Sequence, residues 1–142
     1  MTHGLDTSFL VAVEVGSHGE HLACRTRFQR LLKAGDTFSL APQILAEFIH
    51  VVTDPRRFSA PLTPEQAVAR AEIWWNAAEV IHVFPTADST LLCLGWLEEY
   101  KLGRKRLLDT MLASTLQAGG VTSILTLNRD DFSVFGGFTF PK

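Results

Sequence analysis

The sequence predicts an α/β fold in which a mostly parallel central sheet is covered by helices on both faces. Short apolar segments with strand patterning alternate with amphipathic helical segments, as expected when crossover helices join parallel strands. The 142 residues are 46% hydrophobic and 20% charged, a composition typical of a folded domain. No internal repeat, low-complexity tract or linker divides the chain. We therefore expect a single domain over residues 1–142.

The strands are short, and breaking or capping residues mark the ends of the helices. One strand ends at Leu5-Asp6, and three more are expected at 37–40, 80–84 and 123–127, with a possible edge strand at 138–140. Helices are expected at 8–15, 21–33 and 42–52, then from Thr63-Pro64 onwards, and at 88–102 and 109–117.

The apolar spacing also predicts which helix faces are buried. In the helix that begins at Thr63-Pro64, the expected inner face is Val68, Ala71, Trp75 and Ala78, and in 88–102 it is Leu91, Leu94 and Leu97. Residues 128–131 are expected to form a turn.

Composition limits the possible partners and compartments. The formal charge of -2 gives a nucleic acid no general attraction, so such a partner would need a local basic patch or a metal. No apolar stretch approaches the ~20 residues that span a bilayer, and Asp6 would interrupt a secretory leader, so we expect a cytoplasmic protein. Cys24 and Cys93 indicate neither a disulfide framework nor a zinc site. His18 and His21 fit a solvated helix start better than a metal pair.

Oxygen-bearing side chains follow the expected strands. Asp6 follows the first strand, Glu47 lies on the helix after the second, Asp109 begins a helix, and Asn128 and Asp131 follow the last strand. Ligands of parallel sheets bind outside the carboxyl ends of the strands, so these residues are candidates for one site. Clustered carboxylates repel one another unless a hard divalent cation neutralises them, and Mg²⁺ or Mn²⁺ is the expected ion.

Each candidate also has a structural interpretation. Asp6 can be a turn residue and Asp109 a helix N-cap. Glu47, flanked by apolar residues, must either face solvent at the helix edge or be paired within a site, because an unpaired buried carboxylate costs several kcal/mol. The run 104–106 can be a solvated loop or a patch that contacts phosphates.

Four segments, taken together and in order, resemble PIN domains, and most closely the VapC-type toxin ribonucleases. They are residues 5–10 (LDTSFL), 44–48 (ILAEF), 103–113 (GRKRLLDTMLA) and 125–132 (LTLNRDDF). The resemblance spans essentially the whole chain. It implies a three-layer α/β/α sandwich, Mg²⁺- or Mn²⁺-dependent endoribonuclease activity, homodimerisation and inhibition by a small cognate antitoxin.

The resemblance also implies roles for individual residues. Asp6, Glu47 and Asp109 match the acidic metal-site residues, with Glu47 either a ligand or a base that orients water. Ser8 matches a small polar residue that supports the first aspartate, and Thr126 matches a hydroxyl before the fourth position. Many members carry an acid where this chain has Asn128, so either Asn128 or Asp131 would complete the site. The implied reaction is attack of a metal-activated water on the scissile phosphorus, with Ser8, Thr126 and the basic residues Arg104, Lys105 and Arg106 next to the RNA.

Two rival functions remain to be weighed. A haloacid-dehalogenase-like phosphohydrolase also places an aspartate after its first strand, but it needs a second aspartate where this chain has Ser8. A catalytically silent PIN-like module would bind RNA or a protein without cutting. Titration with magnesium or manganese separates the second rival from a nuclease, because a silent module should bind neither ion specifically.

Overall fold

The computed structural model describes all residues from 1 to 142 and contains one four-stranded, all-parallel sheet. The strand order is β3-β2-β1-β4. The strands are β1 (Thr2–Leu5), β2 (Thr37–Leu40), β3 (Val80–His82) and β4 (Ile124–Leu125). The helices are α1 (Thr7–Glu14), α2 (His21–Lys33), α3 (Pro42–Val52), α4 (Pro64–Asn76), α5 (Ala87–Glu99), α6 (Leu107–Ala118) and α7 (Arg129–Ser133), with a short 3₁₀ helix η1 (Arg104–Arg106).

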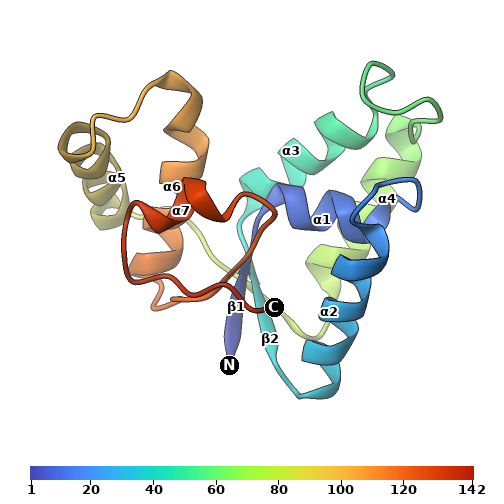
Figure 1. The fold of residues 1–142 in the computed structure, drawn as a ribbon, viewed down its shortest axis with the longest axis horizontal. Helices are drawn as coiled ribbons and strands as arrows, with labels where there is room; N and C mark the ends of the chain where they lie inside the picture. Colours follow the sequence, from blue (N-terminus) through green and yellow to red (C-terminus); the bar gives the residue numbers. More distant parts are fainter.

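The helices form two groups on opposite sides of the strands. In Figure 1, α1 to α4 gather on the right of the sheet and α5 to α7 on the left. This arrangement confirms the predicted α/β fold with a parallel sheet between helical layers. None of the helices combines the length and apolar character that a membrane span requires.

Local sequence signals explain where the helices begin. Pro42 occupies the first turn of α3, where its missing N–H costs nothing. Thr63 caps α4 through a capping box, since its hydroxyl accepts the backbone N–H of Gln66 and the Gln66 side chain accepts the N–H of Thr63. The predicted bounds 37–40, 42–52 and 21–33 agree with the structure.

Strand β1 lies inside the sheet and therefore places the residue that follows it at the centre of the carboxyl edge. Gly4 pairs with Ser39 of β2 on one side and with Ile124 of β4 on the other. A Cβ atom on Gly4 would collide with the side chain of Leu116 in α6. The absent side chain thus lets α6, which carries Asp109, pack directly against β1, which leads to Asp6.

Helix α5 differs from the prediction in the face that it buries. Leu91 and Leu94 are 68% and 57% exposed, whereas Cys93 and Trp96 are buried. The indole of Trp96 stacks on Phe135 with ring centroids 4.5 Å apart. The spacing of the leucines identified a helix, but aromatic packing from the C-terminal segment decides which side faces the protein.

Helix α4 is rotated by about one position from the predicted face. Its buried residues are Ala67, Ala71 and Trp74, while Val68 is 43% exposed and Ala78 lies beyond the end of the helix. The ring of Trp74 packs against Phe28 of α2 and its Nε1 donates to Glu14 at 2.7 Å. That partly buried hydrogen bond and the ring contact select Trp74 over its neighbour as the inward residue.

The C-terminal segment also differs from the prediction. Residues 129–133 form the short helix α7 instead of a turn. The segment 138–140 makes only one isolated parallel bridge, between Thr139 and Ser123.

Candidate active site

Asp6 is the most buried carboxylate of the candidate site, with 5% of its surface exposed. It immediately precedes α1, and its Oδ1 accepts the backbone N–H of Thr7 at 2.8 Å. Its Oδ2 accepts hydrogen bonds from the hydroxyls of Ser8 at 2.9 Å and Thr126 at 2.6 Å. Burial raises the pKa of Asp6, and these three hydrogen bonds partly offset the rise. Asp6 is therefore held in a fixed orientation by donors that favour its ionised form.

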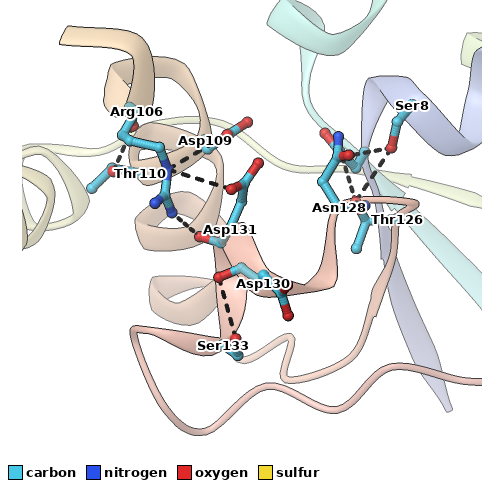
Figure 2. A network of polar contacts seen from close by, with 10 residues as sticks. Ser8, Arg106, Asp109, Thr110, Thr126, Asn128, Asp130, Asp131 and Ser133 are labelled. Atoms are coloured by element: carbon cyan, nitrogen blue, oxygen red, sulfur yellow. Dashed lines mark hydrogen bonds and ion pairs between the residues drawn. The ribbon is translucent and has the colours of Figure 1, made fainter. Parts of the chain in front are cut away.

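The same hydroxyls connect the loop after β4 to the start of α1. Ser8 Oγ accepts the backbone N–H of Leu127 at 3.0 Å, and Thr126 Oγ1 accepts that of Asn128 at 2.9 Å. Figure 2 shows Ser8, Thr126 and Asn128 at this junction. Because each hydroxyl both donates and accepts, Ser8 and Thr126 position Asp6 and the loop together.

Glu47 is half-buried on α3. Of the two alternatives that the sequence leaves open, the structure shows the one in which the Glu47 carboxylate is paired within the site. Its Oε2 accepts a hydrogen bond from the hydroxyl of Thr7 at 3.1 Å. Burial raises the pKa of Glu47, and the charge of Asp6 raises it further. Its carboxylate and that of Asp6 are thus electrostatically coupled across the start of α1.

Asp109 lies in the first turn of α6, one turn beyond the N-cap residue Arg106. Its pKa is raised to about 6, mainly by burial and then by the charges of Asp6 and Asp131. The nearby guanidinium of Arg106 lowers that pKa but does not cancel the rise. The helix N-cap interpretation of Asp109 is wrong, because α6 begins at Leu107 and Arg106 is its N-cap residue.

Arg106 lies between two of the acids, as Figure 2 shows. Its Nε is 3.9 Å from Asp109 Oδ2 and 3.9 Å from Asp131 Oδ1, and a terminal nitrogen donates to the backbone carbonyl of Asp131. The buried Nε itself has no hydrogen-bond partner. Arg104 and Lys105, in contrast, are exposed on η1. The basic run is thus divided: Arg106 faces the acids and the other two face solvent.

A cleft of about 320 Å³ brings the main candidates together. Its walls contain the three predicted carboxylates and Asn128, but not Asp131, whose carboxylate is directed towards Arg106. The remaining lining residues are Thr7, Ser8, Val11, His18, Val51, Arg57 and Phe58. The sequence predicts a solvated helix start at His18, and no pattern in it indicates Arg57 or Phe58. These three stand on loops after α1 and α3, and no sequence spacing links them to the acids.

The donor set of this cleft suits a hard divalent cation. Carboxylate, hydroxyl and amide oxygen atoms line its acidic end, and carboxylates with raised pKa values gain from a neighbouring positive charge. No three His, Cys, Asp or Glu side chains lie close enough to enclose one ion. Mg²⁺ commonly keeps several waters and takes only one or two protein carboxylates, so the arrangement fits that ion without a protein cage.

A buried serine–histidine–aspartate contact lies at the opposite edge of the sheet. His3 Nδ1 is 2.7 Å from Ser123 Oγ, and His3 Nε2 is 3.1 Å from Asp36 Oδ2. Ser123 is 0% exposed and His3 only 2%, so no substrate reaches the serine. This contact joins β1 to its neighbours and is structural.

Known proteins resemble this chain over almost its whole length. Ribonuclease VapC31 of Mycobacterium tuberculosis is 27% identical over 126 residues, which cover 89% of this chain and 88% of the relative. The crystal structure of VapC20 of M. tuberculosis, a toxin that cleaves the sarcin-ricin loop, superposes with a TM-score of 0.73 at 20% identity and covers 100% of both chains. A toxin-antitoxin complex from Klebsiella pneumoniae gives a TM-score of 0.62 at 16% identity, with 99% of this chain and 98% of the other covered.

The family assignment follows from a broader comparison. The sequence model that describes the PIN domain matches residues 5–137, which include every carboxylate of the cleft. The all-parallel sheet and the two helical layers agree with that match. This chain belongs to the PIN domain family.

Proposed function

We propose that this protein is a divalent-metal-dependent endoribonuclease and the toxin of a toxin–antitoxin pair, acting in the cytoplasm. The observation that carries the proposal is the group of three carboxylates with raised pKa values, Asp6, Glu47 and Asp109, on the walls of one cleft. Perturbed acids in a cleft are typical of catalytic sites. The ribonuclease relative and the toxin structures support RNA as the substrate.

The residues divide the work of hydrolysis. Asp6 and Asp109 would hold Mg²⁺ or Mn²⁺, and Glu47 would either complete the ligand set or orient the attacking water as a base. The ion, when bound, lowers the pKa of a coordinated water and screens the phosphate's charge. Asn128 offers a neutral amide at the cleft wall. Asp131 is paired with Arg106, so we assign it to positioning that arginine.

Cleavage of a labelled single-stranded RNA tests this proposal. The wild-type protein should cut in Mg²⁺ or Mn²⁺ and stop in EDTA, leaving 5′-phosphate and 3′-hydroxyl ends. Asp6→Asn and Glu47→Gln should be inactive while retaining the wild-type circular dichroism spectrum. The absence of both specific metal binding and cleavage of any RNA would instead identify a binding module.

The proposed toxin would have two protein partners. An antitoxin would bind this chain and block the cleft, and a second copy of the chain would form a homodimer. The toxin-antitoxin complex among the structural relatives supports the first partner. Co-expression with the product of an adjacent small reading frame tests it, and light scattering of the purified protein tests the homodimer. An RNA-cleaving protein that is not inhibited by any neighbouring gene product would contradict the toxin assignment.

A further inference from the structure

The far end of the catalytic cleft differs in charge from the acidic end. Asp6 precedes α1 and His18 follows it, so the cleft extends along a helix of eight residues, or about 12 Å. Glu47 lies on α3, and Arg57 and Phe58 stand on the loop beyond the end of that helix. In Figure 1 this loop is the green segment above α4, and the loop that carries His18 is the blue segment below it, next to the label of α4. The cleft therefore leads from carboxylates to basic side chains.

Arg57 is the only lysine or arginine on the cleft wall. A polyanion that enters this cleft must approach three carboxylates, and the chain as a whole carries a charge of -2. Arg106 is occupied by Asp109 and Asp131. Within the cleft, Arg57 thus carries the one permanent positive charge that can attract a phosphate.

The loop holds Arg57 in place and leaves its terminal nitrogens available. Oδ1 of Asp54 accepts the backbone N–H of Arg56 at 2.9 Å, and the backbone carbonyl of Asp54 accepts the N–H groups of Arg57 and Phe58 at 3.1 and 3.2 Å. The Nε of Arg57 is 3.6 Å from Asp54 Oδ2. Neither terminal nitrogen of Arg57 donates a hydrogen bond to the protein, and the side chain is 59% exposed. A guanidinium whose Nε faces Asp54 keeps both terminal nitrogens, the planar pair of donors that suits a phosphate.

His18 supplies a second donor on the same wall. Its Nδ1 accepts the backbone N–H of Glu20 at 3.0 Å, so in the neutral ring the hydrogen resides on Nε2. Phe58 adds an aromatic surface beside these two polar residues. A cation beside an aromatic side chain is the combination that proteins use to bind single-stranded nucleic acids, and the ring N–H of His18 adds a hydrogen-bond donor.

We propose that Arg57, with His18 beside it, forms a subsite for a phosphate of the RNA strand outside the bond that is cut. This inference rests on the proposed ribonuclease function and names how that site holds its substrate. The length of α1 separates the subsite from Asp6, so the bound phosphate belongs to a flanking nucleotide. RNA that extends beyond the scissile bond therefore binds more tightly than RNA that ends near it.

Arg56 provides a matched control for the test. It adjoins Arg57, pairs with the same Asp54 and is 86% exposed, but it does not line the cleft. Arg56→Gln and Arg57→Gln change the net charge equally. Cleavage kinetics should be measured for both variants on a short RNA confined to the scissile bond and on the same RNA extended on either side.

We expect Arg57→Gln to raise KM for an extended RNA about tenfold and to leave kcat within about twofold, as for loss of a charged hydrogen bond made equally in the ground and transition states. Arg56→Gln should match the wild type, and on the short RNA all three proteins should be equal. The salt dependence of binding to the extended RNA should fall by about 0.7 in log–log slope for Arg57→Gln alone.

Direct binding separates the failure of this inference from the failure of the proposed function. Fluorescence anisotropy with labelled extended RNA in EDTA measures affinity without cleavage. Equal affinities for Arg56→Gln and Arg57→Gln, whether both reduced or both unchanged, would overturn the subsite. If Arg57→Gln alone loses affinity but the wild type cuts no RNA in any metal, the subsite stands and the ribonuclease function fails.

Discussion

The hydroxyl of Thr126 donates a 2.6 Å hydrogen bond to Oδ2 of Asp6, although 120 positions separate the two residues. Ser8 shares that carboxylate oxygen, and Thr126 also accepts the backbone N–H of Asn128. One threonine therefore connects the β1–α1 junction, the buried acid and the loop after β4. Groups that orient a metal ligand in this way set its affinity for the ion.

Replacement of Thr126 by valine should weaken the site without altering the fold. The loss of one hydrogen-bond donor to a buried carboxylate should raise the pKa of Asp6 further and reduce Mg²⁺ affinity by about 10- to 100-fold. Unfolding stability should fall by about 1 kcal/mol. Isothermal titration calorimetry and denaturant unfolding measure the two effects. Thr122→Val is the control, because Thr122 is exposed and its hydroxyl makes no hydrogen bond; an equal loss of affinity in both variants would contradict the role of Thr126.

Strand and helix positions were predictable where local chemistry alone determines them. The capping box at Thr63 and Gln66 and the proline at the start of α3 mark helix starts in any context. Asp6 was recognisable because it directly follows a strand, and Glu47 because it lies on the helix that follows one; the carboxyl ends of parallel strands share one edge. The structure places both on the same cleft.

Features that depend on packing between distant segments were not predictable in the same way. The buried face of α5 is selected by contact between Trp96 and Phe135, and leucine spacing carries no information about that contact. The pairing of Arg106 with Asp131 likewise requires η1 and α7 to lie together. Arg57 lines the cleft because the loop after α3 borders it, and no motif encodes that placement.

Stability without metal should depend on pH through Asp109. Its folded pKa of about 6 exceeds the ordinary value of 3.8, so between these values the folded state binds more protons than the unfolded state. Stability should therefore decline as pH rises from about 4 to about 6, and the loss should persist at neutral pH. Asp109→Asn should reduce this decline, leaving the part that Asp6 and Glu47 contribute through their own raised pKa values, and should gain about 1 kcal/mol at pH 7 in EDTA, less than the full shift implies because the carboxyl is partly exposed.

Urea unfolding across this pH range measures the effect of Asp109. Asp88→Asn is the matched control, since Asp88 is an exposed acid in the first turn of α5. If Asp109→Asn and Asp88→Asn have the same pH profile as the wild type, the raised pKa of Asp109 is not a source of instability.

Divalent ions should raise the melting temperature of the wild type through the cleft. An ion that binds only the folded chain stabilises it by RT ln(1 + [L]/Kd), so the shift should grow with Mg²⁺ or Mn²⁺ concentration. The effect should vanish in the Asp6→Asn/Asp109→Asn double variant. Differential scanning fluorimetry over a metal titration tests this, and an equal shift in both proteins would place the ion elsewhere.

The divided basic run should produce two distinct phenotypes. Arg104 and Lys105 are exposed, so replacing both by alanine should weaken cleavage of every RNA to a similar degree, because phosphate contacts carry no sequence information. The replacement should also flatten the salt dependence of cleavage, because it removes positive charges that can contact phosphates.

Arg106 has a different role, because its guanidinium lowers the pKa of Asp109. Arg106→Gln should therefore move the acidic limb of the pH–rate profile to higher pH, because a larger fraction of Asp109 is protonated and unable to bind metal. Profiles from pH 5 to 8 at two salt concentrations separate the two roles. An unshifted acidic limb in Arg106→Gln would show that Arg106 does not act through Asp109, and a shifted one in Arg104→Ala/Lys105→Ala would show that the two roles are not separate.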